Sequence, residues 1–107
     1  VLVRKIGAPD PPELAVGAVA ESGWRFEADF AARLGADREW LDAAAARELR
    51  TIRERRARWT PGRSPVDVRG RTAIVLDDGL ATGATMIAAL HAVRQRGPAR
   101  LVCAVPV

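Results

Sequence analysis

Two apolar runs separated by a helical pattern, within residues 72–105, most constrain what this chain can fold into. Residues 72–76 lack the alternation of a half-exposed strand, which predicts a central strand buried on both faces. A helix is expected at 83–96, where a Gly-Pro pair follows as a stop signal. Residues 100–105 predict a second buried strand. This order indicates a right-handed βαβ unit in a parallel sheet.

The part of the chain before this unit predicts shorter strands. Residues 1–4 form an apolar run compatible with a buried strand, and the proline-rich stretch 7–12 predicts a loop. Residues 13–21 alternate as a second strand does, and 24–29 can continue it as a hairpin. We therefore expect two or three strands before the first helix.

A long helix is predicted at residues 38–58. Asp37 can cap its N-terminus, and apolar residues recur at positions 41, 45, 49 and 52 with helical spacing. The Pro and Gly residues of 60–65 end the helix. Trp40 and Trp59 are expected to pack against the sheet or a neighbouring subunit.

Length and composition favour one globular domain, which we assign to residues 1–107. Hydrophobic residues make up 49% of the chain and charged residues 28%, which is ordinary for a folded protein. The chain begins without Met on one apolar run and ends on another. We therefore expect a segment of a longer protein, with a fold that is incomplete at both ends.

The cysteine count and the hydropathy exclude several classes. A single Cys excludes an internal disulfide and a multi-cysteine zinc site. Neither a signal peptide nor an apolar run of about 18 residues occurs, so we expect a cytoplasmic protein without membrane association. Cys103 lies in a predicted buried strand, which favours packing over reactivity. His91, the only His, is expected at the surface or at the boundary of the core.

The basic residues could attract phosphorylated metabolites or nucleic acid. The formal charge is +4, and Lys5 is the only Lys in an Arg-dominated chain. Residues 47–63 contain seven Arg against two Glu, which could attract RNA. We interpret this stretch as a solvated helix face, because no aromatic stacking platform accompanies it in the sequence. Nucleic acid is therefore not expected as a partner.

Residues 74–86 hold the groups that indicate chemistry. Asp77 and Asp78 follow the predicted buried strand at its carboxyl end, where ligands bind in open α/β sheets. Ionised carboxylates only accept hydrogen bonds, and a cis diol supplies two donors. The acidic pair therefore favours a ribose diol.

The residues after the acidic pair favour a phosphate. They lie at the N-terminus of the predicted helix, where free amides and the helix dipole attract anions, and they are Ala81, Thr82, Gly83, Ala84 and Thr85. The glycine permits close approach, and the threonines offer hydroxyl donors. A diol site beside a phosphate site predicts a ribose 5-phosphate site. The alternative is a strand-to-helix turn with Asp caps, but capping explains only one of the two acids.

Residues 74–86 resemble the motif with which type I phosphoribosyltransferases bind 5-phosphoribosyl 1-pyrophosphate (PRPP). The resemblance implies a three-layer α/β/α fold around a parallel sheet. It also implies that Asp77 and Asp78 hold the ribose 2′ and 3′ hydroxyls as catalytic groups. Residues 81–85 would hold the 5′-phosphate.

Other positions carry the comparison further. Arg4 and Lys5, at the end of the first predicted strand, are similar to an Arg-Lys pair of orotate phosphoribosyltransferases, which implies that Lys5 contacts pyrophosphate. The loop at 7–12 would occupy the place of the family's mobile lid. The family's pyrophosphate loop follows an earlier strand, for which no residues precede Val1 in this sequence.

Ala81 bears on the acceptor base. Enzymes for 6-oxopurines have an Asp general base at this position, so hypoxanthine and guanine are disfavoured. The Ala-Thr-Gly form resembles adenine and uracil enzymes.

The resemblance implies a transferase of the pentosyl class that acts in nucleotide metabolism. It would move ribose 5-phosphate from PRPP to a nitrogenous base and release pyrophosphate, with Mg²⁺ held mainly by PRPP rather than by protein ligands. A homodimer is the family's habit. One alternative is a PRPP-sensing regulatory or nucleic-acid-binding protein without turnover. Another is a phosphoribosyltransferase-like domain appended to another enzyme.

Overall fold

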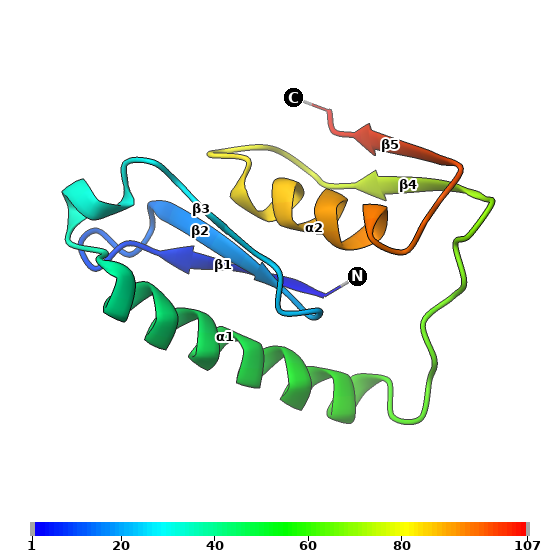
Figure 1. The fold of residues 1–107 in the computed structure, drawn as a ribbon, viewed down its shortest axis with the longest axis horizontal. Helices are drawn as coiled ribbons and strands as arrows, with labels where there is room; N and C mark the ends of the chain where they lie inside the picture. The colour runs from blue at the N-terminus through cyan, green and yellow to red at the C-terminus, as the bar shows by residue number, and fades with distance from the viewer. Residues whose placement is uncertain (1, 107) are drawn as a thin grey trace.

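The computed structural model describes residues 2–106, and within them an antiparallel sheet forms first along the chain (Figure 1). Its strands are β1 (Val3–Gly7), β2 (Ala15–Ala20) and β3 (Arg25–Glu27), with β2 in the centre. Every residue of β2 is buried. The hairpin expected after the second strand is confirmed, because β3 pairs antiparallel with β2.

The long helix α1 (Arg38–Trp59) covers one face of this sheet and follows a short 3-10 helix, η1 (Ala31–Leu34). The predicted cap is confirmed, since the Trp40 amide donates to the Asp37 carboxylate at 2.8 Å. The apolar stripe of α1 is buried against β1 and β2 and consists of Leu41, Ala44, Ala45 and Ile52. α1 therefore encloses one half of the core.

The second helix, α2 (Ala84–Arg94), lies on the opposite face of the antiparallel sheet (Figure 1). Small residues allow the close approach of α2 to β2, and they form a buried cluster of Ala15, Ala18, Ala84 and Ala88. The expected α/β fold with helices on both faces of a sheet is thereby confirmed. The sequence did not reveal that this central sheet is antiparallel.

The parallel pair of β4 (Thr72–Leu76) and β5 (Arg100–Ala104) borders the other side of α2. The strand, helix and strand predicted from the sequence are confirmed, with bounds that differ by one or two residues. The two strands form a separate sheet within residues 2–106. α2 therefore lies between the two sheets.

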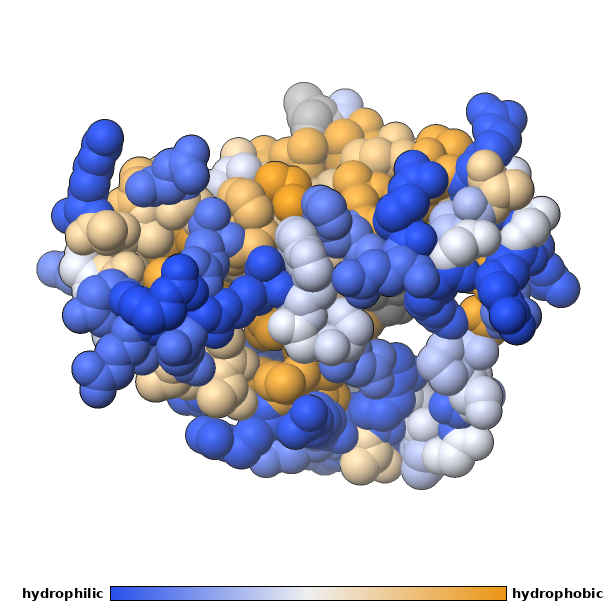
Figure 2. Space-filling model, viewed as in Figure 1, coloured by the Kyte–Doolittle hydropathy of each residue, from blue (hydrophilic) through white to orange (hydrophobic). Residues whose placement is uncertain are grey.

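The expectation that β4 is buried on both faces is wrong. Its residues alternate between half-buried and exposed, and the side chains of Ile74 and Leu76 are 59% and 75% exposed. A parallel strand is buried on both faces only when elements cover both, and in the described part of the chain α2 covers one. Figure 2 shows the resulting apolar surface over β4 and β5, whereas α1 presents mostly hydrophilic side chains.

Three smaller expectations need correction. Cys103 is exposed rather than packed, because β5 lies at the edge of the two-stranded sheet. Trp59 is 72% exposed and does not pack against the sheet, although Trp40 packs against the core. Lys5 lies in the middle of β1, not at the end of the strand, because pairing with β2 continues to Gly7.

Candidate functional site

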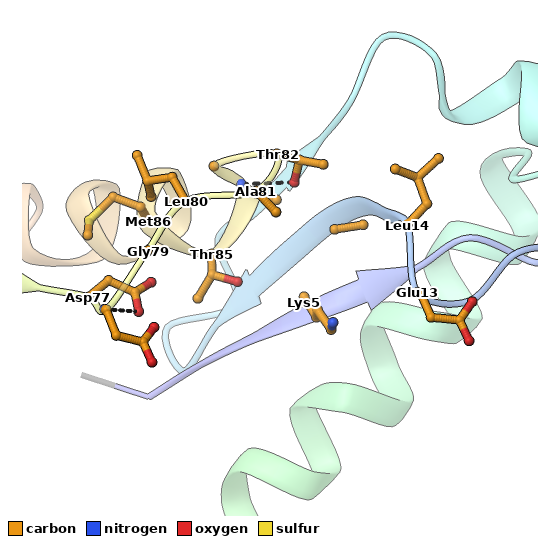
Figure 3. Close-up of a pocket in the computed structure, with 14 residues that line it drawn as sticks. Lys5, Glu13, Leu14, Asp77, Gly79, Leu80, Ala81, Thr82, Thr85 and Met86 are labelled. Carbon is orange, nitrogen blue, oxygen red and sulfur yellow. Dashed lines mark hydrogen bonds between the residues drawn. The ribbon is translucent and has the colours of Figure 1, made fainter. Parts of the chain in front are cut away.

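The acidic pair follows β4 directly. The Asp77 amide donates to the Ala104 carbonyl at 3.2 Å, which extends the contact between β4 and β5 by one residue. The Asp77 Oδ1 atom accepts the amide of Asp78 at 2.8 Å (Figure 3). This bond fixes the Asp77 carboxylate, while the exposed Asp78 carboxylate stays free to accept hydrogen bonds from a ligand.

The loop that precedes α2 has the backbone of an anion site. Gly83 is the N-cap, with φ 82° in the left-handed region that favours glycine. No acidic side chain lies in the first turn of α2, and no side chain hydrogen-bonds from the N-cap. The Ala84 amide has the Thr82 hydroxyl as a distant partner, at 3.4 Å. The positive end of the helix dipole is therefore available to an anion.

A pocket of about 370 Å³ joins the acidic pair to this loop (Figure 3). All the residues predicted for the site line it: Lys5, Asp77, Asp78, Ala81, Thr82, Gly83, Ala84 and Thr85. Lys5 reaches the pocket from β1, where it pairs with Ala18 and so shares the face of the sheet that α2 covers. Residues from opposite ends of the sequence thus meet in one hollow.

Sequence reasoning missed Glu13 and Leu14, which line the same pocket (Figure 3). They precede β2, and the pairing of Gly7 with Ala15 brings them back toward β1. A signal existed, because a hairpin between the first two predicted strands would have placed residue 13 near residue 5. Local patterns alone do not determine such pairing.

The loop between β1 and β2 is closed by its own backbone. The Ala8 amide donates to the Leu14 carbonyl at 2.7 Å, and the Leu14 amide donates to the Pro11 carbonyl at 3.2 Å. A side chain at Gly7 would collide with the Pro12 carbonyl, since a Cβ atom would lie 2.1 Å from its oxygen. The loop therefore stands at the rim of the pocket, and its role as a lid remains a prediction.

His91 and Cys103 lie away from this pocket. His91 is exposed, as expected, and its ring stacks on Trp24 with centroids 4.0 Å apart. Both residues line a shallow hollow between α2 and β5, together with Leu90, Arg94 and Leu101. Neither contributes to the site.

Comparison with known proteins identifies relatives over the whole chain. Two proteins from strains of Mycobacterium tuberculosis, CDC 1551 and H37Rv, are each 40% identical to it over 108 residues and bear the name "Putative phosphoribosyl transferase". The chain spans 24% of the length of these relatives. The crystal structure of the protein TT1426 from Thermus thermophilus superposes with a TM-score of 0.71 and 47% identity, over 99% of this chain and 50% of that one.

The family model named phosphoribosyl transferase domain matches residues 12–107. That range contains the acidic pair and the loop before α2, and it begins just before Glu13. The chain belongs to the phosphoribosyl transferase domain family.

Proposed function

We propose that this protein binds PRPP in the pocket between β1 and α2 and transfers its ribose 5-phosphate to a nitrogenous base. The observation that carries the proposal is the meeting of two carboxylates and a free helix N-terminus in one pocket of about 370 Å³. A ribose 5-phosphate has a diol at one end and a phosphate at the other. The two halves of the pocket match these two ends.

Each group has a distinct task in this proposal. Asp77 and Asp78 accept hydrogen bonds from the ribose hydroxyls, and such charge-assisted bonds are stronger than neutral ones. The amides that begin α2 and the hydroxyls of Thr82 and Thr85 donate to the 5′-phosphate. Lys5 supplies the one cationic side chain among the lining residues, which suits the pyrophosphate group.

The reaction requires little covalent work from the protein. A nitrogen of the base attacks the anomeric carbon, and the bond to pyrophosphate breaks with its electron pair leaving on pyrophosphate. Positive charge develops on the ribose as that bond breaks. The carboxylates of Asp77 and Asp78 stabilise this charge, because they are fixed close to the ring before the reaction begins.

The donor set fits a magnesium ion held mainly through the substrate. Within residues 2–106, no three side chains of His, Cys, Asp or Glu lie close enough together to hold a metal ion. Mg²⁺ commonly keeps several waters and binds through substrate phosphates with one or two carboxylates. Asp77 and Asp78 are the carboxylates that such an ion would meet, and it would neutralise charge on pyrophosphate.

PRPP binding by the full-length protein tests the proposal. Asp78→Asn removes a charged acceptor, and we expect it to weaken PRPP binding at least about tenfold in calorimetry. Asp67→Asn is the matched control, because Asp67 is exposed, pairs with Arg69 and does not line the pocket. Equal PRPP affinity of wild type and Asp78→Asn would contradict the proposal.

Turnover is tested separately from binding. Pyrophosphate release in the presence of a nitrogenous base supports the transferase, and binding of PRPP without release under any base would favour a sensor. In the described residues, no helix is both long and apolar enough to cross a membrane.

A further inference from the structure

The pocket holds one carboxylate without a role in the proposed reaction. Glu13 lines it at the rim formed by the loop between β1 and β2 (Figure 3). Its side chain is exposed, and none of the ion pairs within residues 2–106 involves it. A carboxylate that the protein leaves unpaired beside a substrate pocket is available to a ligand.

The backbone fixes the position of Glu13. On one side of it, the Leu14 amide is bound to the Pro11 carbonyl and the Leu14 carbonyl to the Ala8 amide. On the other side, Pro12 is pressed against Gly7 so closely that no side chain would fit there. Glu13 is therefore carried by a closed turn at the start of β2.

The arrangement of charges tells which part of a substrate Glu13 can meet. In the view of Figure 3, Lys5 lies between Asp77 and Glu13. The diol and the phosphates of PRPP account for the acidic pair, the loop before α2 and Lys5. A phosphate would be repelled by Glu13, and Glu13 forms no metal-binding cluster with the acidic pair. What remains is the acceptor.

We infer, on the basis of the proposed function, that Glu13 receives the proton of the acceptor and selects neutral N–H heterocycles over acidic ones. As the acceptor nitrogen forms its bond to the anomeric carbon, the bond to pyrophosphate breaks and its electron pair leaves with pyrophosphate. The N–H proton of the acceptor passes to the Glu13 carboxylate and then to water. Leu14, next to Glu13 on the pocket wall, supplies an apolar contact for a flat ring.

Two observations favour this assignment over a role in binding PRPP. Ala81, on the loop before α2, has no group that can take a proton, so the proton must go elsewhere. A fixed carboxylate also repels acceptors that carry their own carboxylate, such as orotate. The structure therefore assigns both the proton transfer and the selection of acceptors to one side chain.

The test uses the full-length protein with Mg²⁺ and PRPP. Pyrophosphate release is measured with adenine, cytosine and uracil as neutral acceptors and with orotate as the acidic one. The variants are Glu13→Gln, which keeps the shape, and Glu13→Asp, which keeps the charge. Glu54→Gln is the control, since Glu54 is exposed on α1 and does not line this pocket.

We expect wild type to use at least one neutral acceptor and to reject orotate. Glu13→Gln should lower kcat for that acceptor by about 100-fold, the lower range for loss of a general base, and abolish the fall of rate at acidic pH. Its PRPP affinity should change less than twofold. Glu13→Asp should recover part of the rate, and Glu54→Gln should behave as wild type.

Three outcomes would overturn the inference. They are turnover of Glu13→Gln at the wild-type rate, PRPP binding without release by any neutral acceptor, and use of orotate by wild type. Loss of PRPP affinity in Glu13→Gln would overturn it as well, by placing Glu13 on PRPP. Failure of wild type to bind PRPP is a different result, because it overturns the proposed function itself and removes the inference with it.

Discussion

The two sheets of this molecule differ in how they are covered. Helices lie on both faces of the β1–β3 sheet, and the central strand β2 has no exposed residue. The β4–β5 pair has α2 on one face, so that Ile74 and Leu76 remain largely exposed. The first sheet provides most of the buried core, while the second ends at the acidic pair.

The difference teaches that stability and chemistry are divided between the two regions. A site at the carboxyl end of a strand needs that strand to be placed, not to be the most deeply buried element. α2 connects the regions, because its buried alanines pack on β2 and its first turn completes the pocket. Substitutions should therefore affect the two sheets very differently.

The largest expected contrast is in unfolding free energy between two isoleucines. Ile52→Ala, at a side chain 1% exposed beneath the first sheet, should destabilise the chain by about 2–5 kcal/mol. Ile74→Ala, at 59% exposed on β4, should cost less than about 1 kcal/mol. Urea unfolding of both variants measures this. Equal losses would show that the outer face of β4 is covered in solution.

A smaller effect is expected where α2 begins. Gly83→Ala should destabilise the chain by about 1–2 kcal/mol, because φ is 82° there and an alanine disfavours that region. The cost is one of backbone conformation, since the nearest atom to an added Cβ is 4.0 Å away. Gly79→Ala is the control, with no positive φ and open space around it. Equal thermal stability of the two variants would contradict the assigned backbone.

A pH-dependent effect is expected at the ion pair between the first sheet and α1. Two hydrogen bonds from Arg56 hold the pKa of Glu21 below its ordinary value. The pair therefore stabilises the fold above the ordinary carboxyl pKa, and this contribution is lost as pH falls through the lowered pKa. Glu21→Gln should be less stable than wild type at neutral pH and equal to it in acid. A stability difference that persists in strong acid would refute this origin.

The smallest effect on stability is expected at β5, where Cys103 is exposed. Cys103→Ser should leave the unfolding free energy within about 0.5 kcal/mol of wild type, as is usual at the surface. A thiol reagent should label the native chain at one site, at a rate near that of the unfolded chain. Labelling that requires unfolding would show that β5 is covered, as its apolar sequence first suggested.

The local patterns predicted the types of the elements well. The cap at Asp37 and the spacing of apolar residues predicted α1 to within one residue of its observed end. The strand-helix-strand unit also formed as predicted, because each element depends on neighbours in sequence. The error at β4 has a different cause: burial depends on which distant elements cover a strand, and an apolar run does not contain that information.

The candidate site shows the same division. The residues after β4 form a continuous motif, so their chemistry could be recognised from the sequence, and the structure brings them together with Lys5 in one pocket. Glu13 could not be recognised, because its only link to the motif is the antiparallel pairing of β1 with β2. The shared pocket of residues 13 and 77 has no trace in local spacing.

The sequence by itself determined the segment with two acids and the Thr-Gly-Ala-Thr loop, since hydrogen-bonding capacity and backbone freedom belong to the residues themselves. It also determined where helices and strands form. Only the tertiary structure decided that β2 is the buried centre, that β4 keeps an exposed face, and that Lys5 and Glu13 share a pocket with Asp77. These facts arise from long-range packing, which is set by how the elements assemble.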